Sequence, residues 1–127
     1  MNLIEQLKRH EGFRGAPYQD TEGVWTIGYG LTNITKEEAE TILRMRVETL
    51  RKQLELHLYS LDPARQDVIL NMAYNLGVLG VMGFQRMWAA IYRHDYEEAA
   101  RQMLNSKWRR QVGQRAVELA RIMESGR

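Results

Sequence analysis

The stretch from Glu11 to Gly30, EGFRGAPYQDTEGVWTIGYG, limits the possible folds of this 127-residue chain more than any other part of it. Residues 20–23, Asp-Thr-Glu-Gly, are typical of a tight turn. Residues 24–27, Val-Trp-Thr-Ile, are β-branched or aromatic and therefore favour a strand, and an extended run precedes the turn. The sequence predicts a small β-hairpin, with Asp20 near its tip and Thr26 on the returning strand.

A short amphipathic helix is expected before this hairpin. Apolar residues recur between Leu3 and Leu7 at the spacing of one helix face, and Gly12 is a helix breaker, so Glu11 should be the last helical residue. A carboxylate at a helix end and Asp20 on a hairpin belong to separate elements, so they can flank a cleft. Two carboxylates on one face of the same helix could not flank a cleft in this way.

A pair of carboxyl groups facing each other across a cleft supports general acid/base hydrolysis of a glycosidic bond. One carboxyl has to be protonated to release the leaving oxygen, while the second, on the opposite face of the sugar, activates water or stabilises the positive transition state. The alternative for Glu11 or Asp20 alone is a solvated acid at a helix end or turn, because 16 acidic residues are scattered through the chain.

The spacing of these residues resembles a known family. Glu11, eight residues, Asp20, five residues, Thr26 and then Ile-Gly-Tyr-Gly is similar to the active-site signature of the phage-type (T4-like) lysozymes or endolysins, glycoside hydrolase family 24. The resemblance implies an α+β, mainly α fold, in which a small β-hairpin lobe is joined by a long helix to a helical bundle lobe. It also implies hydrolysis of the β-1,4 bond between N-acetylmuramic acid and N-acetylglucosamine in peptidoglycan.

The same resemblance implies roles for the three residues. Glu11 would protonate the leaving oxygen, while Asp20 would act from the far face, with Thr26 positioning the attacking water. Because the family inverts the anomeric configuration, the two carboxyls are expected roughly 6.5–9.5 Å apart.

The chain departs from the family pattern after the hairpin. Gly28 and Gly30 provide flexible backbone, which allows another element or a ligand to approach closely. Family members usually carry a histidine next and then a longer connection, whereas Leu31 follows here and a helix begins soon after Asn33. We therefore expect a shortened hairpin lobe, with Leu31 at a substrate-binding position.

The remaining chain predicts helices only. Thr35 and Glu38 form a capping box that opens a connecting helix over about residues 35–58, roughly 35 Å long at 1.5 Å per residue. Asp62 followed by Pro63 begins an apolar, buried helix that Gly77 should end as a left-handed cap. Further helices are expected over residues 84–92, after Asp95, around Trp108 and over residues 114–123, the last with Ala116, Val117, Ala120 and Met123 inward.

These elements predict one lysozyme-like domain over residues 1–127. The hairpin lobe would cover about residues 12–34, the connecting helix about 35–58, and the helical lobe about 62–127 together with the N-terminal helix 2–11.

Two further stretches, ILNMAYNLGVLGVMGF and EEAARQMLNSKW, resemble the family's helical lobe. By this resemblance Tyr74 and Asn75 lie at the cleft, Gln102 contacts sugar, Lys107 faces the cleft, and Arg115 approaches the catalytic glutamate. From the residues alone, Tyr74 could equally belong to the core, Gln102 and Lys107 to the surface, and Arg115 could be a solvated helix charge.

Composition adds limits of its own. The chain has no cysteine, which excludes disulfides and thiolate metal sites. His10, His57 and His94 are too dispersed for a metal site, and we expect neither a metal nor a cofactor. A net charge of +2 with a pI of about 9.0 suits an anionic polymer such as cell wall, and suits nucleic acid equally.

No apolar stretch of signal-peptide or membrane-span length occurs, so we expect no signal peptide and no stable membrane insertion. The resemblance implies a monomeric phage or prophage enzyme for host cell lysis, made in the host cytoplasm and acting on peptidoglycan in the periplasm. It also implies a holin-like membrane permeabiliser as the partner that gives the enzyme access to the wall.

Two alternatives remain open. The shortened lobe and the missing histidine would fit a protein that keeps the fold but binds the wall without catalysis. The basic run over residues 107–110, with Arg115, would fit a helical nucleic-acid binder, although no helix-turn-helix pattern supports it and the family resemblance implies no nucleic-acid partner.

Overall fold

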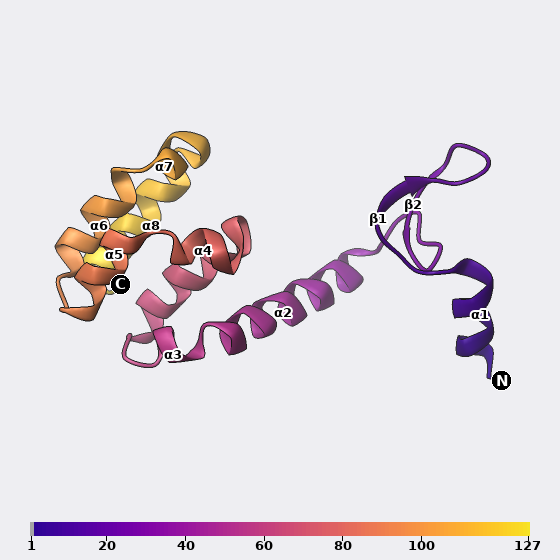
Figure 1. The fold of residues 1–127 in the computed structure, drawn as a ribbon, viewed down its shortest axis with the longest axis horizontal. Coiled ribbons are helices and arrows are strands. Elements are labelled where there is room, and N and C mark those ends of the chain that lie inside the picture. Colours follow the sequence, from indigo (N-terminus) through magenta and orange to yellow (C-terminus); the bar gives the residue numbers. More distant parts are fainter. Residues whose placement is uncertain (1) are drawn as a thin grey trace. The chain divides into compact units, whose positions relative to one another are not determined.

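The computed structural model of the protein describes residues 2–127, and it contains eight helices and one two-stranded antiparallel sheet in that range (Figure 1). The predicted α+β, mainly α fold is thus confirmed. The elements in chain order are α1 (Leu3–Glu11), β1 (Arg14–Gln19), β2 (Trp25–Gly28), α2 (Lys36–Gln53), α3 (Glu55–Leu58), α4 (Pro63–Met82), α5 (Gln85–Tyr92), α6 (Tyr96–Leu104), α7 (Lys107–Val112) and α8 (Gln114–Ser125). The chain divides into two compact units, unit 1 up to Leu43 and unit 2 from Arg44 onward.

Helix α1 begins and ends where the sequence predicts. The Asn2 side chain accepts a hydrogen bond from the Glu5 backbone N–H, and the Glu5 carboxylate accepts one from the Asn2 N–H, which makes a capping box. Glu11 is the last helical residue, and Gly12, at a φ of 71°, turns the chain out of the helix.

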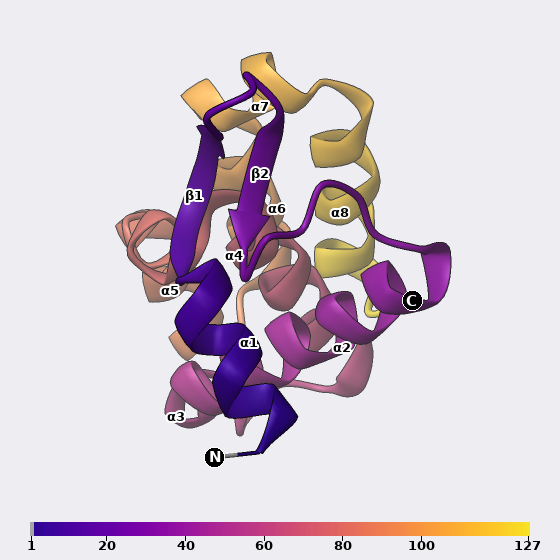
Figure 2. The same ribbon diagram turned by 90° about the vertical axis from the view of Figure 1, so that its right-hand side faces the viewer.

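The hairpin of β1 and β2 also forms as predicted (Figure 2). Tyr18 pairs with Thr26 and Gln19 with Trp25, so Thr26 lies on the returning strand close to the turn. The register shifts between Arg14 and Tyr18, which marks an irregularity in β1. Thr26 is the one buried residue of unit 1 from residue 2 onward.

The connecting helix is shorter than expected. The Thr35–Glu38 capping box is present, with Glu38 N–H donating to the Thr35 hydroxyl at 3.1 Å and Thr35 N–H donating to the Glu38 carboxylate at 2.9 Å. The prediction of one helix to residue 58 is wrong, because Leu54 leaves helical dihedrals with a ψ of 7° and separates α2 from α3. Leu54 is only 1% exposed, so core packing outweighs helical periodicity at this position.

Helix α4 begins at Asp62 and Pro63 as predicted, and Gly77 interrupts it as predicted, with a second helical stretch following the kink. Gly77 has a φ of 79° and a ψ of 166°, which lies outside the left-handed helical region, and the chain returns to helix as far as Met82. The prediction of a left-handed cap is therefore wrong. The φ of 79° accounts for a glycine at the kink, because residues with a side chain are strained in that conformation even though no atom lies within 4 Å of where a Cβ of Gly77 would stand.

Unit 2 contains the hydrophobic core of the described chain, built from residues between Leu54 and Met123. Helix α6 packs against α5 and α8, and α8 also contacts α4 and α7 (Figure 1). On α8, Ala116, Ala120 and Met123 are buried as predicted, whereas Val117 is 38% exposed and that prediction is wrong. Leu119 takes the inward place, because it lies on the same helix face as Ala116 and Met123.

No single helix among residues 2–127 combines the length and the apolar composition needed to cross a membrane, while α4 and α5 meet that test only as a pair bent by 92°.

Candidate active site

The Glu11 carboxylate lies directly over the backbone of Gly30. A Cβ atom built on Gly30 would stand 2.8 Å from Glu11 Cδ and would overlap Glu11 Oε2. Gly30 also has a φ of 74°, a backbone conformation that residues other than glycine rarely adopt. The close approach expected from the glycines of the hairpin is therefore made by Glu11 itself, which ends α1 and whose side chain meets the loop after β2.

Asp20 organises the turn of the hairpin. Its Oδ1 accepts hydrogen bonds from the backbone N–H groups of Glu22 at 2.8 Å and Val24 at 2.9 Å. Its own backbone N–H donates to the Val24 carbonyl at 2.9 Å. These bonds leave Oδ2 without a hydrogen-bond partner among residues 2–127, so one carboxylate oxygen holds the turn and the other is available.

Thr26 is connected to Asp20 through one residue. The Thr26 hydroxyl donates to the Val24 carbonyl at 3.0 Å, the same oxygen that accepts from the Asp20 backbone N–H. Since the hydroxyl has one proton and that proton is used, its lone pairs remain free to accept a hydrogen bond. The sequence predicted that Asp20 and Thr26 share the hairpin, and the bonds through Val24 add that they share one hydrogen-bonded unit.

Leu31 lies at the end of the loop that follows β2. It pairs with Ile27 in an isolated bridge, in which the backbone N–H of each residue donates to the carbonyl of the other at 2.9 Å. Its side chain is 44% exposed and stands against Gly28. Unit 1 thus contains Glu11, Asp20, Thr26 and Leu31, while the separation of the two carboxyls stays a prediction.

In unit 2, Arg115 of α8 is held by a residue that the sequence analysis did not identify. Its guanidinium donates to Asn71 Oδ1 at 3.0 Å and 2.7 Å and to the Asn71 backbone carbonyl at 3.3 Å. Asn71 precedes Tyr74 and Asn75 by three and four positions, so all three lie on one face of α4. That spacing of polar residues in an apolar helix could have revealed Asn71.

The two expected cleft residues on α4 differ in their surroundings. Asn75 Oδ1 accepts a hydrogen bond from Trp108 Nε1 at 2.8 Å, and Trp108 is only 3% exposed, so Asn75 satisfies a buried donor. Tyr74 is 50% exposed and lines a pocket of about 450 Å³ together with Arg46 and Leu50. Of the two, Tyr74 presents an accessible aromatic surface.

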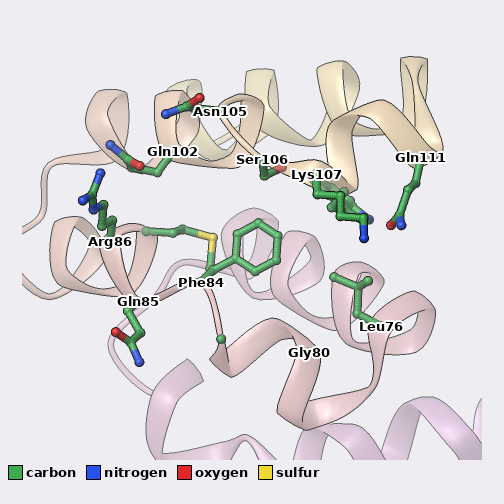
Figure 3. Close-up of a pocket in the computed structure, with 13 residues that line it drawn as sticks. Leu76, Gly80, Phe84, Gln85, Arg86, Gln102, Asn105, Ser106, Lys107 and Gln111 are labelled. Atoms are coloured by element: carbon green, nitrogen blue, oxygen red, sulfur yellow. The ribbon is translucent and has the colours of Figure 1, made fainter.

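Gln102 and Lys107 line one pocket of about 510 Å³ between α4, α5, α6 and α7, which we call the helical-lobe pocket (Figure 3). Gln102 Nε2 donates to Glu98 Oε1 at 2.8 Å, which fixes the orientation of the amide. Lys107 has no ion pair among residues 2–127. The structure therefore brings together the two α6–α7 residues that the sequence places at the substrate.

Within residues 2–127, no group of three or more His, Asp or Glu side chains is arranged to hold a metal ion.

A family model and several similar proteins all indicate the same family for this chain. Residues 8–122 match the phage lysozyme family. The central spike protein Gp5 of Enterobacteria phage T4 is 29% identical over 99% of this chain, which spans 28% of that protein. Probable T4-type lysozyme 1 of Dictyostelium discoideum is 27% identical over 98% of this chain, which spans 95% of it.

An endolysin of Acyrthosiphon pisum secondary endosymbiont phage 1 is 34% identical over 57% of this chain and 55% of its own length. The alignments with Gp5 and the Dictyostelium protein extend over 161 positions, so these relatives carry residues that this 127-residue chain lacks. The difference agrees with a shortened member of the family. The match over residues 8–122 includes Glu11, the hairpin and the helical-lobe pocket, and the chain therefore belongs to the phage lysozyme family, a family of lysozyme-type peptidoglycan hydrolases.

Proposed function

We propose that the protein is a muramidase that hydrolyses the β-1,4 bond between N-acetylmuramic acid and N-acetylglucosamine of peptidoglycan, with inversion. The observation that carries this proposal is the arrangement in unit 1. Glu11 lies over Gly30 at the base of the hairpin, and Asp20 and Thr26 are joined through Val24 at its tip. Membership of the phage lysozyme family supports the reaction class, and the arrangement in unit 1 supports the choice of residues.

In the proposed reaction, Glu11 protonates the oxygen that leaves the sugar. On the opposite face, Asp20 withdraws a proton from the attacking water through Oδ2, the oxygen that the turn does not use. Thr26 accepts a hydrogen bond from the same water, because its own proton is directed to the Val24 carbonyl. The mechanism requires the two carboxyls to be roughly 6.5–9.5 Å apart, leaving room for the water.

The substrate-binding part of the proposal uses the remaining residues. Tyr74 offers an exposed ring on which a sugar can stack, and Leu31 an exposed apolar side chain beside the hairpin loop. Gln102 and Lys107 contact the glycan from the helical-lobe pocket. Asn75 keeps Trp108 in place, and Arg115, oriented by Asn71, supports Glu11 electrostatically.

We further propose the biological setting of an endolysin. The protein acts as one lysozyme-like domain and as a monomer without a cofactor, is made in the host cytoplasm, and digests the wall in the periplasm during host cell lysis. A holin-like permeabiliser gives it access to the wall. This setting is supported by the similarity to a phage endolysin.

The direct test is loss of turbidity of permeabilised Gram-negative cells. Glu11→Gln keeps the shape of the side chain but cannot donate the proton, so we expect a rate at least about a hundredfold lower. Glu40→Gln, which changes an exposed acid of α2 in the same way, is the matched control and should lyse cells at the wild-type rate. Lysis retained by Glu11→Gln would remove Glu11 from its role.

Mass spectrometry of the digested wall distinguishes the reaction types. Reducing-end muramic acid is the expected product, whereas anhydro ends would indicate a lytic transglycosylase. Wall binding by the wild-type protein without any product would support the non-catalytic alternative.

A further inference from the structure

Trp88 and Tyr92, one turn apart on α5, form a stacked aromatic pair in unit 2. Their ring centroids lie 5.7 Å apart at an interplanar angle of 29°, within the range of stacked aromatic rings. Trp88 is only 3% exposed, whereas Tyr92 is 55% exposed. The pair therefore connects a ring buried in the core to a ring that solvent reaches, at a separation across which an electron passes readily.

His57 of α3 adds a base to this pair. Its Nδ1 lies 2.7 Å from the Tyr92 hydroxyl oxygen, and its ring also packs against Trp88 with centroids 5.4 Å apart. In the neutral imidazole that carries its proton on Nε2, Nδ1 accepts the phenolic hydrogen bond. Partial burial raises the pKa of Tyr92 above its ordinary value of 10.0, so the phenol keeps its proton at neutral pH. The phenol thus has a proton to lose and a base that can receive it.

Trp88 has no such base. Its indole N–H donates to the Val81 backbone carbonyl at 2.9 Å, and a peptide carbonyl does not take up a proton at neutral pH. Trp88 that has lost an electron therefore remains a radical cation, which is a strong electron acceptor. Tyr92 can supply the missing electron readily, because its proton moves to His57 in the same step and no positive charge develops on the phenol.

We propose that Trp88, Tyr92 and His57 form a relay that carries one-electron oxidation out of the core of unit 2. A one-electron oxidant such as the carbonate radical anion takes an electron from Trp88. Tyr92 returns an electron to Trp88 while its phenolic proton moves to His57 Nδ1, which leaves neutral tryptophan, a tyrosyl radical and an imidazolium. A water-soluble reductant such as ascorbate then gives Tyr92 an electron, and His57 returns the proton. The relay is independent of the proposed muramidase function.

A second tyrosine–histidine pair in unit 2 lacks two of these features. The Tyr96 hydroxyl lies 3.1 Å from His94 Nδ1, but no tryptophan ring packs against Tyr96 among residues 2–127. The Arg65 guanidinium also lies 3.7 Å from the centroid of the Tyr96 ring, and a cation at that place opposes the removal of an electron. In the same part of the chain no cation lies over the Tyr92 ring. Tyr96 is therefore the matched control for Tyr92.

Laser flash photolysis of the intact protein tests the relay, because ultraviolet light ejects an electron from exposed and buried tryptophans alike. In the wild-type protein, part of the tryptophan radical absorbance should convert to tyrosyl radical absorbance. Tyr92→Phe keeps the stacked ring but has no hydroxyl, so it should lose most of this conversion. Tyr96→Phe makes the same change in the control pair and should convert as the wild type does. Equal conversion in Tyr92→Phe and the wild type would overturn the proposal, and so would an equal loss in Tyr96→Phe.

The role of the base is tested separately. Glutamine at position 57 can still accept a hydrogen bond from Tyr92 but cannot take up its proton, so His57→Gln should slow the conversion, whereas His94→Gln should not. The conversion in the wild-type protein should also be slower in D₂O than in H₂O, because a proton moves together with the electron. Equal rates in the two solvents would contradict the relay. This comparison needs no variant, so it decides the proposal even if a variant fails to fold.

The protective effect is measured by peptide mapping. The protein is exposed to the carbonate radical anion with ascorbate present, and oxidised Trp88 is quantified by mass spectrometry. We expect Tyr92→Phe to accumulate oxidised Trp88 several-fold faster than both the wild type and Tyr96→Phe, each shown by circular dichroism to be folded before exposure. If Trp88 is oxidised at the same rate in Tyr92→Phe and the wild type, oxidation does not leave the core through Tyr92 and the proposal is wrong.

Discussion

The position of the Glu11 carboxylate depends on residue 30 being a glycine, which has no side chain. Gly30 presents only backbone to Glu11, and any larger residue would occupy the space of the carboxylate. A contact of this kind leaves the carboxylate oxygens free for other partners, because packing against a methylene group uses no lone pair. The position of Glu11, the proposed general acid, is therefore set by steric contact with Gly30.

We expect Gly30→Ala to displace Glu11 and to lower lytic activity at least about tenfold, since proton transfer requires hydrogen-bond contact between the acid and the leaving oxygen. The measurement is the turbidity rate together with the NMR signals of unit 2. Activity should fall while the signals of the helical lobe stay in place.

Gly23→Ala is the matched control for this substitution. Gly23 has a φ of 80°, close to that of Gly30, so alanine there carries the same backbone strain of about 1 kcal/mol. No atom lies within 4 Å of where its Cβ would stand. If Gly23→Ala lowers activity as much as Gly30→Ala, backbone strain and not the clash with Glu11 accounts for both.

At the scale of elements, Arg65 joins the beginning of α4 to the end of α8. Its guanidinium donates to the backbone carbonyls of Met123 at 2.6 Å and Glu124 at 2.8 Å, and to Asp62 Oδ1 at 2.9 Å. It also lies over the Tyr96 ring, 3.7 Å from the centroid. One side chain thus satisfies carbonyls at the C-terminal end of α8 and pairs with the residue that caps α4.

This pairing predicts a pH dependence of stability. Burial alone would raise the pKa of Asp62, but hydrogen bonds from the Arg65 side chain and backbone outweigh it and hold the pKa below the usual 3.8. A lowered pKa in the folded state contributes stability that is present above pH 3.8 and is lost as the pH falls through the folded-state pKa.

We expect Asp62→Asn to be less stable than the wild-type protein near neutral pH and to lose that difference in acid, because asparagine can cap the helix but carries no charge. Urea unfolding from about pH 7 to about pH 2 measures it. Asp67→Asn, which changes an exposed residue one turn later, is the control. A stability difference that is the same at every pH would contradict the role of the Asp62 charge.

At the scale of the whole chain, the buried apolar residues are unevenly divided. All of those in the core lie between Leu54 and Met123, whereas unit 1 from residue 2 onward buries Thr26 alone. A chain of about 40 residues without a core, a disulfide or a metal rarely folds by itself. Unit 2, in contrast, has a hydrophobic core of its own.

We therefore expect a fragment of residues 44–127 to fold cooperatively and a fragment of residues 1–43 to lack stable structure. Circular dichroism during heating should show a sigmoidal transition for the longer fragment and a featureless change for the shorter one. A cooperative transition in the 1–43 fragment would show that the hairpin unit is stable without a core.

What the sequence could predict was decided by local interactions. The caps at Thr35 and Asp62, and the turn at Asp20, each depend on residues no more than four positions apart, and all three are confirmed. The break at Leu54 and the exposure of Val117 depend on which positions the core accommodates, and the pattern along one helix does not contain that information.

The same distinction applies to the candidate site. The sequence placed Asp20 and Thr26 on one hairpin, because a turn and two strands are readable over a few residues. The partner of Arg115 is 44 positions away at Asn71, and the lining of the helical-lobe pocket combines residues of four helices, α4, α5, α6 and α7. Such neighbours follow from the packing of helices, so pattern reasoning along the chain could not supply them.

The hydrogen bonds that meet at Val24 make the tip of the hairpin a self-contained module. Asp20 and Thr26 depend on each other through a single peptide carbonyl, and none of these bonds reaches beyond residue 26. Deletions downstream of the hairpin would remove chain without removing any of these contacts. During evolution, the gene could therefore lose codons downstream of the hairpin while the hairpin tip keeps its internal geometry.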